Sequence, residues 1–468
     1  MNSDKPREEC GVFGIYAPEQ DTARLTYFGL YALQHRGQES AGIAVSDGRR
    51  INVHKAMGLV AEVFADDALI TGLRGKMALG HVRYSTTGSS LLANAQPLVV
   101  HFQHGMMALA HNGNLTNATS LKEELCRRGV VFHSTTDSEI ILNLIAGYKR
   151  HNLEDAVIKT MMDIRGAYAI LVMGDGKIIG ARDPHGIRPL CIGVLEGRYC
   201  FASESCALDV IGAEFVRDVR PGEVATISAE GLSSLQSMSG SETAHCSFEY
   251  IYLARPDSTM DKVNVWESRF RMGRQLALEY PLEADLVIPV PDSGTPAALG
   301  YAQTTGRHFA EGLMKNRYVG RTFIQPTQEM RENSVRIKLN GNERVLRGKN
   351  VVMVDDSIVR GTTSLKLIQL VRHCGAREVH MLISSPPVRH SCYYGIDTAE
   401  RERLIANNMD VEGIRRFIGA DSLYYLSEAG LRAALRDRDY CMACFTGVYP
   451  VAPPRGQCKD SLESVSDC

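Results

Sequence analysis

The fold of the second half is decided by the stretch Val351-Val352-Met353-Val354-Asp355-Asp356-Ser357-Ile358-Val359-Arg360-Gly361-Thr362-Thr363-Ser364. Its apolar start is typical of a buried strand, which ends in two acids and a loop of hydroxyl-bearing residues around one glycine. Leu365, Ile368 and Val371 follow at helical spacing, so the stretch predicts a strand, a loop and a helix. Similar apolar runs at Leu286–Val290 and Val379–Ile383 predict a parallel α/β sheet.

The loop of this stretch has the chemistry of a phosphate site. Backbone N–H groups at a helix N-terminus bind phosphate, whereas Asp355 and Asp356 suit ribose hydroxyls or Mg²⁺. The simpler interpretation is a capped helix after a buried strand, with solvated acids at the strand end. Two adjacent acids at the carboxyl end of a parallel strand favour the binding site, because ligands of open α/β sheets bind there.

The first half predicts another architecture. Apolar or alternating runs at Gly11–Tyr16, Ala41–Val45 and Ala167–Met173 predict strands. A helix is expected over Asp137–Ile145, with Asp137 or Ser138 as its cap. The serine-rich segment Ser228–Ser241 predicts a domain boundary, and residues 451–468 predict a loose tail.

Composition narrows the class of protein. A chain of 468 residues predicts two domains. The net charge of -2 shows no excess of basic residues, so nucleic acid is not an expected partner. No apolar run reaches the ~20 residues of a membrane helix, and the N-terminus lacks the apolar core of a signal peptide. We therefore expect a cytoplasmic protein whose 12 cysteines are buried, catalytic or metal-bound rather than disulfide-paired.

Cys10 stands directly before the first predicted strand. A lone cysteine is more often a small buried hydrophobe than a nucleophile. Five segments change that balance, because in this order they resemble the N-terminal-nucleophile (Ntn) glutaminases over about Cys10 to Ala229. The segments are Glu8–Gly14, Leu33–Ser40, Gly80–Thr86, His111–Asn114 and Thr135–Glu139.

This resemblance implies an αββα sandwich in which Cys10 becomes the nucleophile once residues 1–9, a propeptide, are removed. The freed α-amine, with a reference pKa of ~7.7–8.0, suits removal of the thiol proton. Attack on the glutamine amide would give a γ-glutamyl thioester. The resemblance assigns Asn112 and the Gly113 N–H to the oxyanion hole, and Arg83, Thr86 and Asp137 to glutamine binding.

In that assignment Arg83 takes the α-carboxylate of glutamine and Asp137 its α-ammonium. Each residue also has a structural interpretation, since Arg83 can pair with a core acid and Asp137 can cap its helix.

From about Ser247 to Val451 the chain resembles the type I phosphoribosyltransferases, which implies binding of phosphoribosyl pyrophosphate (PRPP). The loop Val290–Ala298 resembles the family's pyrophosphate loop, and the basic segment from Arg317 to Lys338 resembles its flexible loop. Asp355, Asp356 and Ser293 would hold Mg²⁺. The PRPP-binding residues implied are Ser293, Gly294, Thr295, Asp355, Asp356, Ser357, Arg360, Gly361, Thr362, Thr363 and Ser364.

The remaining cysteines contain one metal signal. Cys441 and Cys444 form a Cys-x-x-Cys pair, which alone fits a redox motif or half a zinc site. Spacing does not join them to Cys246 and Cys392. A resemblance does, because one branch of the amidophosphoribosyltransferases carries a [4Fe–4S] cluster on cysteines at corresponding places, together with a short propeptide. Four thiolates suit Fe–S or Zn²⁺.

Both resemblances together imply a glutamine-dependent amidophosphoribosyltransferase, with domains over 10–240 and 241–450 and the product 5-phosphoribosylamine, at the start of purine synthesis. Family membership implies one Mg²⁺ and one [4Fe–4S] cluster per subunit, a homotetramer, and inhibition by purine nucleotides (AMP, GMP, ADP, GDP). Other glutamine amidotransferases would need isomerase repeats or an ATP-pyrophosphatase loop. A PRPP-binding regulator would need a DNA-binding extension and no glutaminase motifs.

Overall fold

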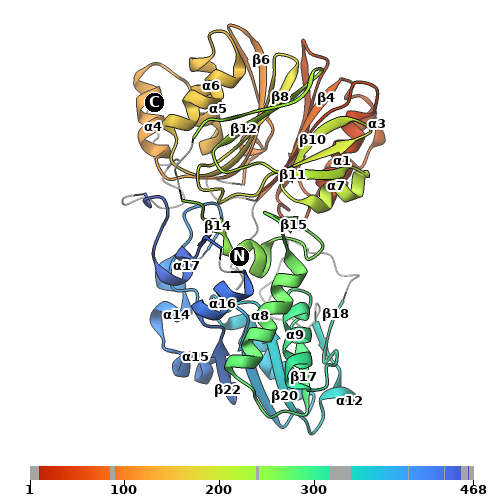
Figure 1. The fold of residues 1–468 in the computed structure, drawn as a ribbon, viewed down its shortest axis with the longest axis vertical. Helices are drawn as coiled ribbons and strands as arrows, with labels where there is room; N and C mark the ends of the chain where they lie inside the picture. The colour runs from red at the N-terminus through yellow and green to blue at the C-terminus, as the bar shows by residue number, and fades with distance from the viewer. Residues whose placement is uncertain are drawn as a thin grey trace.

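The computed structural model describes residues 10–84, 90–238, 242–316, 339–398, 400–436, 438–454 and 462. The chain forms two halves, with antiparallel sheets in the first and a parallel sheet in the second (Figure 1). Both predicted architectures are thereby confirmed.

The first half is built on two facing sheets. The seven-stranded sheet has the order β11-β9-β10-β1-β4-β2-β3, and the six-stranded sheet has the order β13-β12-β8-β7-β6-β5. The strands of the larger sheet are β1 (Gly11–Tyr16), β2 (Ser40–Ser46), β3 (Ile51–Met57), β4 (Met77–Arg83), β9 (Cys191–Leu195), β10 (Arg198–Ala202) and β11 (Glu214–Asp218). The strands of the smaller sheet are β5 (Leu98–Phe102), β6 (Gly105–Leu115), β7 (Gly166–Gly174), β8 (Lys177–Arg182), β12 (Glu223–Ser228) and β13 (Gly231–Gln236).

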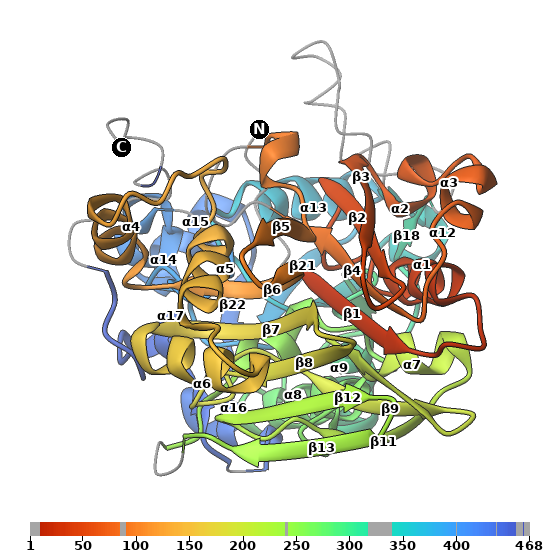
Figure 2. The same cartoon turned by 90° about the horizontal axis from the view of Figure 1, so that it is seen from above.

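Helices cover the outer face of each sheet, which gives four layers (Figures 1 and 2). Beside the larger sheet lie α1 (Thr22–Ala32), α2 (Val60–Val63), α3 (Asp67–Thr71) and α7 (Ser205–Ile211). Beside the smaller sheet lie α4 (Ala118–Arg127), α5 (Asp137–Tyr148) and α6 (Leu153–Asp163), and the turn η1 (Leu92–Asn94) precedes β5.

The alternation of side chains along β1 explains the layering. Phe13 and Ile15 pack into the core shared with α1 and α7, whereas Val12 and Tyr16 pack between the two sheets. Because successive side chains of a strand point to opposite faces, a strand that is apolar on both faces must be covered on both.

The second half is a parallel sheet in the order β17-β20-β21-β22. Alternating residues again face two cores: Val352 and Val354 of β20 pack toward α8 and α9, and Val351 and Met353 pack toward α13. The strands are β17 (Leu286–Pro289), β20 (Asn350–Asp355), β21 (Glu378–Ile383) and β22 (Ser422–Tyr425). The helices are α8 (Val265–Glu279), α9 (Thr295–Thr305), α12 (Glu343–Leu346), α13 (Thr362–His373), α14 (Ile405–Asn408), α15 (Val411–Ile418), α16 (Glu428–Ala434) and α17 (Ala443–Thr446), with the turn η3 (Arg401–Arg403).

Several short elements connect the two halves or lie beside the second sheet. The parallel pair of β14 and β23 brings Cys246 opposite Cys441. The short elements are β14 (His245–Cys246), the π-helix η2 (Glu249–Leu253), β15 (Thr259–Met260), β16 (Val263–Asn264), β18 (Leu313–Lys315), β19 (Leu339–Gly341) and β23 (Tyr440–Cys441). In the described part of the chain, no helix combines the length and the apolar character that crossing a bilayer requires.

The serine-rich segment, where the domain boundary is expected, contains the edge strand β13, whose alternating polar residues tolerate an exposed position. Two sequence-based expectations are corrected. The N-cap of α5 is Thr136, without a side-chain cap bond, because Asp137 accepts a hydrogen bond from the Leu115 N–H instead. Within the expected loose tail, Leu462 is buried in the core of the first half.

The expectation that no cysteine is disulfide-paired is wrong for Cys126, which is disulfide-bonded. Cys126 lies on α4, the helix whose Lys122 donates a hydrogen bond to the Leu462 carbonyl at 2.9 Å. Leu462 therefore lies against this helix, a proximity that the sequence pattern does not reveal. Nine other described cysteines are free thiols.

Candidate functional site

Cys10 is buried at the entrance to β1. Its thiol lies 3.5 Å from the Tyr84 carbonyl, as hydrogen-bond donor. Burial raises the pKa of the Cys10 thiol to about 11, although the Tyr84 contact and the Arg83 charge lower it. Glu39 and Asp137 also act electrostatically on this thiol, so the structure brings Arg83 and Asp137 to the predicted nucleophile. A neutral thiol in this environment needs a base before it can attack.

Asn112 and Gly113 lie on β6, in the sheet that faces β1. Both polar atoms of the Asn112 carboxamide are buried, and neither has a hydrogen-bond partner among the described residues. An unpartnered buried amide is costly and marks a place where a ligand supplies the missing partner. Gly113 has φ +145, and a Cβ there would lie 2.0 Å from the Ala167 carbonyl, so only glycine fits.

Arg83 and Asp137 are both buried. Arg83 donates to Glu39 at 3.0 Å, which matches the structural interpretation of a core pair and leaves the glutamine role a prediction. Asp137 accepts from the Leu115 N–H at 2.9 Å and lies 3.7 Å from His111. Thr86 lies outside the described residues.

The second half contacts this site directly. The Asn114 side chain donates to the Tyr393 carbonyl at 3.0 Å. A Cβ on Gly395 would lie 3.2 Å from the Cα of Gly113, so the segment after Cys392 packs on the predicted oxyanion residue. Sequence reasoning assigned no role to Gly395, because this contact joins positions far apart in the chain.

The two acids of the PRPP motif end β20 at the carboxyl edge of the parallel sheet, as predicted. Both are buried, and the Ser293 hydroxyl, which follows β17, donates to Asp356 at 2.5 Å. The Ser357 hydroxyl donates to the other oxygen of Asp356 at 2.6 Å. The structure therefore joins Ser293 and the acids across neighbouring strands, with oxygen donors of the kind that Mg²⁺ prefers.

Two helix N-termini face the same edge. Gly361, with φ +81, precedes α13, whose first residues are Thr362, Thr363 and Ser364. Gly294 precedes Thr295 and α9, and a Cβ on it would lie 2.4 Å from the Val354 carbonyl. The Nε of Arg360 is buried without a partner within the described ranges. The arrangement offers backbone N–H groups and a cation to phosphate. The segment Arg317–Lys338 lies outside the described residues.

The four cysteines joined by resemblance come from distant segments of the chain, and Cys246, Cys392 and Cys441 lie within electrostatic reach of Cys444. Burial raises the pKa of the Cys444 thiol, and the charges of Cys441, Cys246 and Cys392 raise it further. The buried guanidinium of Arg188 acts electrostatically on Cys246 and Cys392. Among the described residues, no three His, Cys, Asp or Glu side chains are arranged to hold a metal ion.

Comparison with known proteins extends these observations. Residues 81–210 match the family model described as "Glutamine amidotransferase domain". An amidophosphoribosyltransferase of Synechocystis is 52% identical, covering 97% of this chain and 93% of that protein. The Bacillus subtilis amidophosphoribosyltransferase is 49% identical, covering 95% and 94% respectively.

Solved structures agree in both halves. A structure described as the allosteric regulatory enzyme of purine biosynthesis superposes with a TM-score of 0.92 at 47% identity, covering 97% of this chain and 99% of that one. The glutamine PRPP amidotransferase from B. subtilis, complexed with ADP and GMP, superposes with a TM-score of 0.91 at 47% identity, covering 97% and 100%.

Proposed function

The chain belongs to the amidophosphoribosyltransferases, and we propose that Cys10, Asn112 and Gly113 carry the glutaminase half of its reaction. The enzyme takes nitrogen from glutamine and transfers it to PRPP, the first step of purine biosynthesis. The observation that carries the assignment of residues is the buried carboxamide of Asn112, which has no partner in the described part of the chain.

In this assignment the Cys10 thiolate attacks the glutamine amide carbon, and the tetrahedral oxyanion accepts hydrogen bonds from Asn112 and the Gly113 N–H. On collapse of the intermediate the C–N bond breaks, and the nitrogen leaves as ammonia with the proton that the base took from the thiol. Water then hydrolyses the remaining γ-glutamyl thioester to glutamate and regenerates the thiol. Arg83 and Asp137 would bind the α-carboxylate and α-ammonium, with Thr86 as a further contact. Glutamine must then share Arg83 with Glu39, which the guanidinium already contacts.

The raised pKa of Cys10 supports a requirement for a nearby base. Removal of residues 1–9 would place a free α-amine on the same residue, with a reference pKa of ~7.7–8.0. We therefore propose that these residues are a propeptide and that the glutaminase domain spans 10–240.

The ammonia would attack C1 of PRPP in the second domain, 241–450, with loss of pyrophosphate. Asp355 and Asp356 would hold the ribose hydroxyls, and together with Ser293 one Mg²⁺, which neutralises pyrophosphate charge when bound. Ser357 and the residues Arg360 to Ser364 would contact the 5′-phosphate, and Gly294 and Thr295 the pyrophosphate. The mutual hydrogen bonds of Ser293, Asp356 and Ser357 support this set.

Cys246, Cys392, Cys441 and Cys444 would hold one [4Fe–4S] cluster. The electrostatic proximity of four thiols and the adjacent Arg188 cation fit an anionic group. A single Zn²⁺ needs all four sulfurs about 2.3 Å from one point, whereas four irons separate their ligands more widely. Anaerobically purified protein should be brown with about four irons per chain; a colourless protein with one zinc would mean the wrong metal.

Regulation, assembly and location are further parts of the proposal. We propose purine nucleotides as inhibitors, since a 47% identical enzyme is complexed with ADP and GMP; AMP and GDP belong to the same proposal. We also propose that the enzyme is a homotetramer and that it is cytoplasmic. The direct test of the reaction is release of pyrophosphate on mixing the enzyme with glutamine and PRPP. Release that requires both substrates supports the function, and release that ignores glutamine contradicts it.

A further inference from the structure

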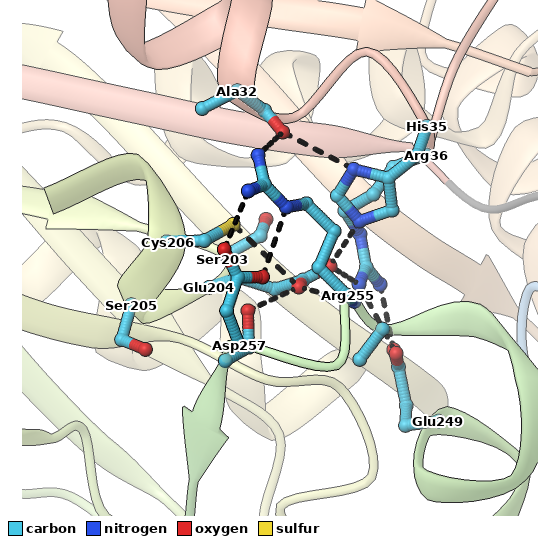
Figure 3. Close-up of polar contacts among 12 residues, drawn as sticks. Ala32, His35, Arg36, Ser203, Glu204, Ser205, Cys206, Glu249, Arg255 and Asp257 are labelled. Carbon is cyan, nitrogen blue, oxygen red and sulfur yellow. Dashed lines mark hydrogen bonds and ion pairs between the residues drawn. The ribbon is translucent and has the colours of Figure 1, made fainter. Parts of the chain in front are cut away.

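A cluster of three buried charged side chains, Arg36, Glu204 and Glu249, joins the two halves (Figure 3). Arg36 lies between α1 and β2, and its side chain is 1% exposed. Its Nε donates to the Cys10 carbonyl at 3.1 Å. Its two terminal nitrogens donate to Glu249, Nη1 at 3.0 Å and Nη2 at 2.6 Å, and Nη1 also donates to Glu204 at 2.5 Å.

The two carboxylates have different origins. Glu204 precedes α7 in the first half, and it also accepts hydrogen bonds from the Ser258 hydroxyl at 2.6 Å and the Arg255 N–H at 2.9 Å. Glu249 belongs to η2, whose apolar residues pack in the core of the second half. Glu249, whose carboxylate accepts hydrogen bonds from both terminal nitrogens of Arg36, therefore belongs to the other half of the molecule.

The segment that carries Glu249 is itself fixed by a second buried arginine. Arg269 of α8 donates to the Tyr250 carbonyl at 2.9 Å and to the Ala254 carbonyl at 2.8 Å, so it holds η2 at both ends. Burial lowers the pKa of Arg269 to about 10, and the charges of Asp356, Glu204 and Glu249 oppose that shift. Arg269 therefore lies within electrostatic reach of both the PRPP acids and the Arg36 cluster.

We propose that Glu249 is a positioning residue of the glutaminase reaction. By holding Arg36 on the carbonyl of Cys10, it fixes the backbone of the nucleophile, so the second half sets the geometry of thiol attack. The proposal rests on Cys10 being the glutaminase nucleophile. A stabilising role alone makes a different prediction: removing one partner of a buried ion pair destabilises the fold, so it would lower synthesis from glutamine and from ammonia together.

The reaction itself separates these accounts. Synthesis from free ammonia does not use Cys10, whereas synthesis from glutamine does. Glu249→Gln should lower glutamine-dependent kcat by about 10²-fold, as a misplaced nucleophile does, with ammonia-dependent synthesis at the wild-type rate. The KM for glutamine should change little, since neither Arg83 nor Asp137 is altered. Alkylation of Cys10 by iodoacetamide, followed by peptide mass, should slow in the variant.

Two further variants make the outcome decisive. Glu223→Gln is the matched control, because Glu223 is a buried carboxylate paired with Arg217 at 2.7 and 2.8 Å, away from Arg36; it should leave both rates unchanged. Glu249→Asp keeps the charge and should restore part of the glutamine-dependent rate. Equal loss of both rates in both Glu249 variants, through misfolding or otherwise, would overturn the proposal. So would an unchanged glutamine-dependent rate in Glu249→Gln.

The assignment of Cys10 is checked in the same series. If Cys10→Ser still used glutamine, the proposed function of that residue would fail independently of Glu249. If Cys10→Ser loses glutamine use and Glu249→Gln does not, only the positioning role is wrong.

Discussion

The two sites of this enzyme are supported differently. The glutaminase site receives contacts from the other half: Glu249 holds Arg36, Tyr393 accepts from Asn114, and Gly395 packs on Gly113. At the PRPP site, Asp356 accepts hydrogen bonds from the hydroxyls of Ser293 and Ser357, which both belong to its own half. The difference predicts a one-way dependence, in which damage to the second half disturbs glutamine use and damage to the glutaminase site leaves ammonia use intact.

The largest effect should come from the PRPP acids. Replacing Asp355 and Asp356 together with Asn removes the charge that orients the ribose and its metal, and should lower synthesis from either nitrogen donor by about 10³-fold or more. Calorimetry with PRPP should show weakened binding, and glutamine hydrolysis should survive only at a low, uncoupled rate. Unchanged PRPP affinity would contradict the assignment.

A substitution of Asn112, the proposed oxyanion residue, tests the glutaminase site. Asn112→Ala should lower glutamine-dependent kcat by about 10²–10³-fold, because a preorganised donor is lost from the transition state, and leave ammonia-dependent synthesis unaffected. Asn117→Ala is the control, since the Asn117 amide donates to the Asp163 carbonyl and bounds α4. If glutamine-dependent kcat fell equally in the two variants, the role of Asn112 would be structural and not catalytic.

Gly395 tests the contact between the halves. Alanine there would place a Cβ 3.2 Å from the Gly113 Cα and adopt φ +115, at a backbone cost of about 1–3 kcal/mol. Glutamine-dependent kcat should fall about tenfold as the oxyanion strand shifts. Gly419→Ala has a similar positive φ of +78 with nothing within 4 Å, so it should destabilise without a selective loss of glutamine use. Thermal melts, together with the rates of synthesis from glutamine and from ammonia, distinguish a general loss of stability from a selective loss of glutamine use.

The last prediction of this series concerns the ionisation of Cys10 and needs no substitution. With a pKa of about 11, the thiolate fraction at pH 7 is about 10⁻⁴ in the chain that retains residues 1–9. The pKa is raised, so the reactive thiolate is gained as pH rises. Iodoacetamide labelling of Cys10 should therefore increase about tenfold per pH unit between 7 and 10. A plateau above pH 8 would show that burial does not set this pKa.

Much of this arrangement is predictable from sequence because its signals are local. The β20 stretch with its acids, the loop after β17 and the strand at Gly11–Tyr16 each combine apolar patterning with adjacent chemistry. The Arg36–Glu249 contact joins positions 213 residues apart, and nothing in either neighbourhood indicates the partner. The packing of Leu462 against α4 is likewise a contact between positions far apart in the chain. Arg36 lies within Leu33–Ser40, one of the segments that resemble the glutaminases, but only the fold brings its side chain to the Cys10 carbonyl.

The central claim is that Cys10 serves glutamine and not PRPP. The most direct measurement is phosphoribosylamine synthesis by Cys10→Ser with glutamine and, separately, with ammonia, at matched PRPP. We predict that glutamine-dependent synthesis is abolished while ammonia-dependent synthesis continues at the wild-type rate. Normal turnover of glutamine in this variant, or loss of both activities in a folded protein, would contradict the account.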